Sequence, residues 1–311
     1  MLTKMNKYHT HIPVLLEESI DLLVTETTGI YVDATLGGGG HTKELLNRLD
    51  TSGKVFGLDQ DKEALKSVEE KIDDQRLHTI LGNFGYISTL LPVDIKKSIS
   101  GILFDLGVST HQIREPERGF SFQEDGPLDM RMSELSGVSA YQIVNEYSYE
   151  KLRDIIFHYG EERLSRQIAR SIISKRPLET TLQLRDAITE VVHGRYTQKS
   201  LARVFQAIRI EVNRELEMLK SALKESLQLL KPGGRIVAIS YHSLEDRIVK
   251  RFFRSGNLEG QIKKDFYGNI IRPLKPVLSK VITPSEEEIR LNPASRSARL
   301  RAAEITKSEG A

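Results

Sequence analysis

Short apolar runs, each ending at a small or acidic residue, mark the places where the chain predicts strands. The four clearest runs cover residues 30–32, 55–58, 102–104 and 235–239. Stretches with apolar residues at helical spacing separate them. Because fully apolar strands that alternate with helices are typical of a parallel sheet buried on both faces, this pattern predicts a doubly wound α/β fold.

A different pattern occupies the middle of the chain. The strand signal is absent between residues 139 and 209, and polar helices are predicted over 150–175 and 182–192. The simplest interpretation is a discontinuous Rossmann-like domain of residues 1–138 and 210–311, interrupted by a small helical domain of residues 139–209.

A longer helical pattern leads into the last apolar run. It covers residues 200–230 and ends at Lys231-Pro232-Gly233-Gly234. Proline and glycine at this point stop a helix and turn the chain into the next strand. We therefore expect one helix over 200–230.

Composition narrows the class of protein. A chain of 311 residues predicts about two domains. The absence of Cys excludes disulfides, thiolate zinc sites and Cys nucleophiles, and it fits a reducing cytosol. The eight His show no ligand spacing such as HExxH, so no metal is predicted. No apolar run approaches the roughly 18 residues of a membrane span, so we expect a cytoplasmic protein without a membrane partner.

Charge is distributed unevenly although the formal net charge is only +2. Residues 1–147 carry 14 Lys/Arg against 23 Asp/Glu, a net of −9. Residues 148–209 carry 12 against 7, a net of +5, and residues 247–301 carry 13 against 5, a net of +8. An acidic half joined to two basic blocks suggests a polyanionic partner. The alternative is that Lys and Arg only decorate solvated helices.

A glycine-rich segment follows the first predicted strand. It reads Asp33-Ala34-Thr35-Leu36-Gly37-Gly38-Gly39-Gly40-His41 and opens a predicted helix over 42–49. Glycines at such a turn let the backbone approach a ligand and expose the N–H groups of a helix N-terminus. The second strand ends at Asp59, where a carboxylate can accept hydrogen bonds from both ribose hydroxyls of an adenosine. This order predicts a nucleotide cofactor, with a plain tight turn as the alternative.

Details of the loop favour S-adenosylmethionine over a dinucleotide. The dinucleotide fingerprint G-x-G-x-x-G expects a third Gly that packs helix on strand, whereas this loop reads G-G-G-G-H. Asp33 precedes the loop, which resembles the D/E-x-x-x-G-x-G pattern of S-adenosylmethionine-dependent methyltransferases. The string Lys231-Pro232-Gly233-Gly234 before a strand is also typical of that class. We therefore predict a class I methyltransferase domain.

Several longer strings narrow the choice further. They are HIPVLL (11–16), GGH (39–41), DLGVS (105–109), RGFSF (118–122), DGPLDMRM (125–132), FQAIRI (205–210), Asn213 and SYHSLEDRIVK (240–250). Over about residues 9–304 the chain resembles the bacterial MraW family, the ribosomal RNA small subunit methyltransferase H family. The resemblance implies methylation of N4 of cytidine 1402 of 16S rRNA in the decoding centre, with S-adenosylmethionine as donor. It also implies a helical insert that helps to recognise the substrate.

The resemblance implies cofactor contacts at the matching positions of this chain. They are Gly39, Gly40, His41, Asp59, Phe84, Asp105 and Gln112. An aromatic ring at Phe84 could stack on adenine, with an ordinary core position as the alternative. The chain departs from the family at Tyr241, where Phe is common.

The proposed chemistry needs a group that accepts a proton from the cytosine amine. That amine is a poor nucleophile because its lone pair is delocalised into the ring, so in-line placement and an acceptor are required. The chain lacks the Asp/Asn-Pro-Pro-Tyr string that many amino methyltransferases carry after the fourth strand. The candidates are Asp105, by its place at the strand end, and then His242 and Asp129. The alternatives are a role in cofactor binding alone for Asp105, a structural histidine, and an Asp129–Arg131 ion pair.

Contacts to RNA are predicted first in the basic region after the last apolar run. The candidate phosphate ligands there are Arg247, Lys250, Arg251, Arg254, Lys263, Lys264, Arg272, Lys275 and Lys280. Phe120 and Phe122 could stack on a base turned out of its helix, with anchoring of their loop as the alternative. The basic segment 295–301 is expected to form either a further contact to RNA or a docked basic helix.

The partner expected from these features is 16S rRNA, within the small ribosomal subunit. Two other classes stay open at this point. One is a ribosome-assembly factor that binds the decoding region without needing to methylate it. The other is a methyltransferase for a protein or a small molecule, which the basic blocks disfavour.

Overall fold

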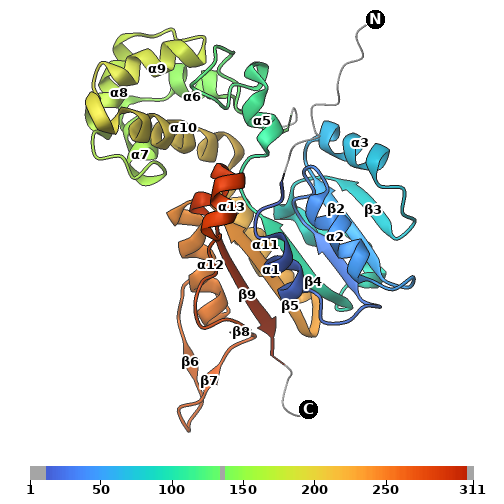
Figure 1. Ribbon diagram of the computed structural model, residues 1–311. Coiled ribbons are helices and arrows are strands. Elements are labelled where there is room, and N and C mark those ends of the chain that lie inside the picture. Colours follow the sequence, from blue (N-terminus) through green and yellow to red (C-terminus); the bar gives the residue numbers. More distant parts are fainter. Residues whose placement is uncertain (1–11, 134–136, 307–311) are drawn as a thin grey trace, which may run out of the picture. The chain divides into compact units, whose positions relative to one another are not determined.

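The computed structural model describes residues 12–133 and 137–306, and the chain divides into two compact units. Unit 1 consists of Met1–Gly107 and Leu216–Ala311, and unit 2 of Val108–Glu215 (Figure 1). His11, the first residue of the HIPVLL string, lies outside the described residues. No helix within the described part of the chain is long and apolar enough to cross a membrane.

A seven-stranded sheet with the order β3-β2-β1-β4-β5-β9-β8 forms the centre of unit 1. Its strands are β1 (Ile30–Asp33), β2 (Lys54–Asp59), β3 (Leu77–Leu81), β4 (Ile99–Asp105), β5 (Leu230–Ser240), β8 (Leu274–Pro276) and β9 (Arg299–Ile305). Neighbours from β3 to β5 pair in parallel, and β9 pairs antiparallel with both β5 and β8. The four apolar runs lie within β1, β2, β4 and β5, so the predicted Rossmann-like α/β fold is confirmed.

Helices cover both faces of this sheet. They are α1 (Leu16–Leu23), α2 (Gly40–Arg48), α3 (Lys62–Lys71), α4 (Ile87–Leu90), α11 (Glu215–Leu229) and α12 (Ser243–Ser255). A further short helix, α13 (Glu286–Leu291), precedes β9 and has no buried residue. Leu103 of β4 and Val237 of β5 share a core cluster with residues of α1 and α2. Their neighbours Ile102 and Ile236 share a second cluster with residues of α11 and α12. Because successive side chains of a strand point to opposite faces and both faces are covered, the apolar runs of the central strands have no alternating polar positions.

The C-terminal strands differ from the predicted pattern. The prediction of a docked helix over 295–301 is wrong for residues 299–301, because Arg299–Ile305 form β9 beside β5. In β9 the basic residues alternate with buried apolar ones. The guanidinium groups of Arg299 and Arg301 both bind the buried carboxylate of Asp246, at 2.9 and 2.7 Å. These two cations therefore have a structural partner within unit 1.

Unit 2 consists of helices around a core of its own. They are α5 (Thr110–Arg114), α6 (Ala140–Glu146), α7 (Tyr149–His158), α8 (Ser165–Ser174), α9 (Thr181–Thr189) and α10 (Thr197–Asn213). Each helix from α6 to α10 contributes fully buried residues, among them Ile143, Ile156, Ile168, Leu184 and Val204. This shared burial makes unit 2 a separate helical body.

Two segments predicted as single helices are each interrupted. Between α7 and α8 the chain turns so that Glu162 enters the interior, where its carboxylate accepts a hydrogen bond of 2.8 Å from Ser200 Oγ. The segment 200–230 breaks at Arg214, whose φ of 50° lies in the left-handed region that ends a helix. Helical periodicity continues across both breaks, so only the tertiary contacts place them.

Unit 2 is longer than the inserted domain predicted over 139–209. Residues before 139 also belong to it because Leu128, Met130 and Met132 are buried in its core. The role of this unit in substrate recognition stays a prediction.

Asn213 holds the segment that carries the DGPLDMRM string. Its Oδ1 accepts the N–H of Met132 at 2.8 Å, and its Nδ2 donates to the carbonyls of Met130 and Arg209 at 2.8 and 2.9 Å. The side chain is buried, so Asn213→Ala deprives these backbone groups of their partner. We expect the free energy of unfolding to fall by roughly 1–3 kcal/mol in a urea titration.

The control for this change is Asn47→Ala on the exposed face of α2. A surface substitution of this kind should shift stability by less than about 0.5 kcal/mol. If Asn213→Ala changes stability no more than Asn47→Ala, the structural role assigned to Asn213 is wrong.

Candidate active site

The candidate site of unit 1 lies where β1, β2 and β4 end. These strands run in parallel, so their carboxyl ends meet at one edge of the sheet, which is where open α/β sheets bind ligands. Their last residues are Asp33, Asp59 and Asp105. Three carboxylates therefore surround the glycine-rich loop that joins β1 to α2.

Glycines shape this loop. Gly37 and Gly39 have φ values of 50° and 78°, in the left-handed region that side chains other than Gly rarely adopt. Gly39 is the N-cap of α2, and a Cβ on Gly40 would lie 2.2 Å from Cγ of Pro13. The turn thus depends on Gly at these places, and α2 begins with N–H groups that the helix itself does not pair.

Asp33 accepts hydrogen bonds from both ends of the glycine-rich loop. Its Oδ2 accepts the hydroxyl of Thr42 at 2.7 Å, and its Oδ1 accepts the N–H of Thr35 at 3.2 Å. Burial raises the pKa of this carboxyl, while the nearby His41 and the Thr42 hydroxyl oppose the rise. The two hydrogen bonds join the end of β1 to α2, so Asp33 acts on the shape of the loop.

Asp59 presents a carboxylate beside the same loop. Its Oδ2 accepts the N–H of Gly37 at 2.8 Å, and its Oδ1 accepts the N–H of Asp61 at 2.9 Å. Burial raises the pKa of Asp59 to about 6, and the charges of Asp61 and Asp33 add to the rise against these two hydrogen bonds. Each carboxylate oxygen keeps a lone pair, so Asp59 can still accept two hydrogen bonds from a ligand.

Asp105 connects β4 to two neighbouring elements. Its Oδ1 accepts the Tyr241 hydroxyl at 2.8 Å, and its Oδ2 lies 3.8 Å from Nδ1 of His41. Its backbone N–H donates to Oγ1 of Thr35 at 2.7 Å. The Asp105 side chain is 14% exposed, so it is largely shielded and oriented while one edge stays accessible.

Burial and the Asp105 charge raise the pKa of Tyr241 well above its ordinary value. The tyrosine therefore stays protonated and donates its hydroxyl proton to Asp105. Sequence reasoning singled out Tyr241 only as a departure from Phe. Its contact with Asp105, and that of Thr35, were missed because they join residues far apart along the chain.

The side chains of His41 and Phe84 both pack against other residues of unit 1. His41 is buried, with Nε2 at 3.2 Å from the carbonyl of Val14. Phe84 is half-buried in the 3₁₀ turn Phe84–Tyr86 and packs edge-to-face on Phe104, with ring centroids 5.9 Å apart. Phe84 thus joins the core at one edge, and its role toward adenine stays a prediction.

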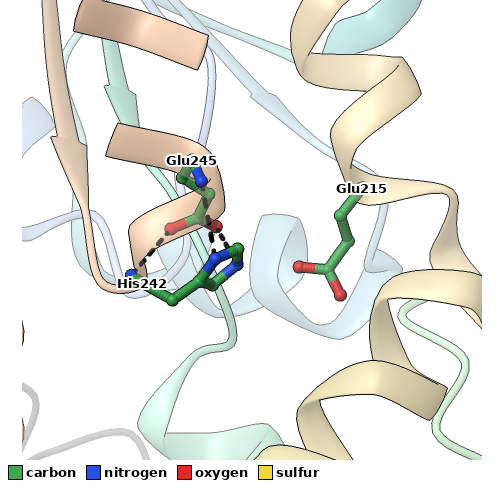
Figure 2. Close-up of side chains that lie close together, drawn as sticks. All are labelled: Glu215, His242 and Glu245. Atoms are coloured by element: carbon green, nitrogen blue, oxygen red, sulfur yellow. Dashed lines mark hydrogen bonds and ion pairs between the residues drawn. The ribbon is translucent and has the colours of Figure 1, made fainter. Parts of the chain in front are cut away.

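His242 follows β5 and begins α12. Figure 2 shows its interactions with Glu245: the Glu245 N–H reaches Nδ1 of His242 at 3.5 Å, and Oε2 of Glu245 accepts the N–H of His242. The same Oε2 also accepts the N–H of Tyr241 at 2.9 Å. His242 Nε2 also lies 3.1 Å from Oε1 of Glu245, without hydrogen-bond geometry. Glu215, also labelled in Figure 2, belongs to unit 2 and forms a two-point ion pair there with Arg209. These contacts support the structural alternative for His242.

Two predicted site residues belong to unit 2. Gln112 completes a capping box with Ser109 at the start of α5, with both hydrogen bonds at 3.1 Å. Asp129 pairs with Arg131 at 2.5 Å. Phe120 and Phe122 pack in the core of this unit, which favours their anchoring role.

The four basic residues first chosen for RNA contact share one exposed face of α12. They are Arg247, Lys250, Arg251 and Arg254. Their spacing of three and four residues keeps them on one side of a helix. Val249, Phe252 and Phe253 occupy the opposite side and are buried in the core. The helix thus presents its cations to solvent as a group.

Comparison with known proteins shows the family of this chain. A model of the MraW methylase family matches residues 8–306. Ribosomal RNA small subunit methyltransferase H of Flavobacterium johnsoniae is 47% identical over 97% of this chain and 99% of its own length. The proteins of that name from Christiangramia forsetii and Amoebophilus asiaticus are each 49% identical, over 94% and 95% of this chain and 97% and 96% of theirs. The chain that builds this carboxylate-lined glycine loop belongs to the MraW methylase family.

Proposed function

We propose that this protein transfers a methyl group from S-adenosylmethionine to N4 of cytidine 1402 of 16S rRNA, in the decoding centre of the small ribosomal subunit. The observation that carries the proposal is the meeting of Asp59, Asp105 and the glycine loop at one sheet edge, in a chain of the MraW methylase family. The rRNA substrate is supported by the names of relatives 47–49% identical along almost their whole length. The cytidine and its N4 atom follow from the family resemblance.

The residues at the sheet edge fit S-adenosylmethionine. Asp59 offers two acceptors at the place where an adenosine ribose needs them, and its raised pKa reflects the burial of that place. The loop before α2 has Gly where the backbone requires it and leaves N–H groups at the helix start for the carboxylate of the methionine part. Phe84 follows the next strand and supplies a ring for adenine. The absence of a pyrophosphate group in this cofactor agrees with the G-G-G-G-H loop.

When bound, S-adenosylmethionine supplies an electrophilic methyl group on a sulfonium. The protein must hold the amine in line with it and accept an amine proton as the nitrogen changes hybridisation. We assign this second task to Asp105, whose Oδ1 is oriented by Tyr241 and whose Oδ2 lies beside His41. His242 and Asp129 stay secondary candidates. No metal takes part in this proposal.

The cations of α12 supply contacts to RNA phosphates in this proposal. Replacing Arg251 by Gln is expected to lower the slope of log affinity against log salt by about 0.7, the value for one phosphate on a single strand. Binding is measured by filter binding to 16S rRNA over a salt series. Lys66→Gln, an exposed change on α3, is the matched control and should leave the slope unaltered. An identical slope for wild type and Arg251→Gln would remove Arg251 from the interface.

One experiment tests the reaction itself. The protein is incubated with methyl-labelled S-adenosylmethionine and either naked 16S rRNA or small subunits, and the label is mapped by nuclease digestion. We expect label on N4 of cytidine 1402, and recovery elsewhere would overturn the assignment. Label on a protein would favour a protein methyltransferase. Tight subunit binding without any label would favour an assembly factor.

A further inference from the structure

A two-stranded hairpin in unit 1 exposes two adjacent aromatic rings. Its strands are β6 (Lys263–Lys264) and β7 (Ile270–Ile271), and Figure 1 shows it extending away from the sheet of unit 1. Phe266 is 98% and Tyr267 86% exposed, more than any other large apolar side chain in the described ranges. A contiguous exposed apolar patch marks an interaction site more often than a single exposed residue does.

The turn that carries these rings is organised. The Asp265 carboxylate accepts the N–H groups of Tyr267 and Asn269 at 2.9 and 2.8 Å, and its other oxygen accepts the Asn269 amide at 2.9 Å. Gly268 takes a φ of 89° and closes the turn. At the base of the hairpin, Arg272 donates to the carbonyl of Arg254 at 2.9 Å. The rings therefore project from a defined support.

Charge around the tip favours an anionic partner. Lys263 and Lys264 are exposed beside the rings. Residues 256–280 contain five Lys/Arg and two Asp/Glu. One of the two acids, Asp265, uses both carboxylate oxygens as acceptors within the turn. Cations beside exposed rings are the combination with which proteins hold single-stranded nucleic acid.

We propose that the hairpin tip binds unpaired RNA, with Phe266 and Tyr267 stacking on bases while Lys263 and Lys264 contact the flanking phosphates. This inference rests on the proposed rRNA substrate and adds to it a contact surface separate from the methyl-transfer site. The two ring planes are 88° apart, with centroids separated by 5.6 Å. Rings at a right angle do not continue one base stack, so each ring takes a different base of a bent or looped strand.

The test uses the absence of Trp from the chain. Phe266→Trp introduces the chain's one indole at the hairpin tip, and Leu291→Trp, in the acidic helix α13, is the matched exposed control. We expect a short mixed-sequence single-stranded RNA to quench the indole fluorescence of the Phe266→Trp variant but not that of the Leu291→Trp variant. Inorganic polyphosphate, which has charge but no bases, should quench neither. Absence of RNA quenching in the Phe266→Trp variant, or equal quenching by polyphosphate, would overturn the stacking proposal.

A second variant separates this inference from the proposed function. Phe266→Ala with Tyr267→Ala should weaken RNA binding by about tenfold or more and raise the KM for the RNA substrate. The affinity for S-adenosylhomocysteine and kcat at saturating RNA should not change. If wild type methylates rRNA and the double variant binds RNA equally well, the hairpin proposal fails alone. If wild type methylates no rRNA, the proposed function fails, and the quenching experiment still decides whether the tip binds RNA.

Discussion

Asp105→Ala is expected to abolish methylation, lowering kcat by roughly 10²–10⁴-fold at saturating S-adenosylmethionine. The change removes the carboxylate that we assign to the amine proton, and it leaves the Tyr241 hydroxyl without its acceptor. Single-turnover transfer of labelled methyl to rRNA measures the chemical step directly. A near-normal turnover with saturating cofactor would show that Asp105 is not the acceptor.

Two further variants separate catalysis from cofactor binding. Asp105→Asn keeps the size of the side chain but removes its charge, so it should be nearly as inactive as Asp105→Ala. Tyr241→Phe keeps the ring and removes only the hydroxyl that orients Asp105, so we expect a loss of roughly 10- to 100-fold, the value of one hydrogen bond to a charged group. A variant of Asp105 that raises the KM for S-adenosylmethionine while kcat stays normal would assign this residue to the cofactor alone.

Asp59→Asn is expected to weaken binding of S-adenosylhomocysteine by roughly 10- to 100-fold, measured by calorimetry at about pH 7.5. The ionised carboxylate accepts both ribose hydroxyls in our proposal. Because the Asn side chain keeps one acceptor oxygen, the variant loses about one hydrogen bond to a charged group, which contributes about 1.5–3 kcal/mol. The matched control is an analogue without the two ribose hydroxyls. It should bind wild type and variant equally, and a large difference for this analogue would contradict a ribose contact.

The raised pKa of Asp59 also predicts a dependence of stability on pH. The folded protein holds the proton up to about pH 6, whereas the group ordinarily titrates near 3.8. Between these values the folded state binds more protons than the unfolded state, so its stability falls as the pH rises. The expected loss between about pH 4 and pH 6 is up to about 3 kcal/mol in cofactor-free wild type relative to Asp59→Asn. Parallel stability curves for the two proteins in urea titrations would contradict the assignment.

The same ionisation controls cofactor affinity. Because ribose hydroxyls donate to the ionised carboxylate, bound cofactor should lower the pKa of Asp59, and affinity should decline as the pH falls below about 6. The pH dependence of stability and the pH dependence of cofactor affinity that come from Asp59 are both absent from Asp59→Asn. The variant is therefore a control for other titrating groups.

The local sequence pattern was sufficient to predict the central strands of the sheet and the loop that follows β1. The runs at 30–32 and 102–104 predicted β1 and β4 because strands buried on both faces must be apolar at every position. Asp59 and the glycine loop were predicted with them, since a strand end and the following turn are neighbours in sequence. Strand β9 was not predicted, because Arg299 and Arg301 hide its apolar alternation and find their partner, Asp246, only in the folded unit.

The sequence by itself determined the α/β class, the place of the loop and the carboxylates at the ends of β1, β2 and β4, because each depends on residues close together in the chain. Only the tertiary structure decided what these groups contact. The Tyr241 hydroxyl donates a hydrogen bond to Asp105, which lies 136 residues away in the sequence. The N–H of Gly37 donates one to Asp59, 22 residues away. The breaks at Glu162 and Arg214 and the exposure of Phe266 belong to the same category. Burial and long-range hydrogen bonds arise from chain segments that meet only on folding, so no local pattern specifies them.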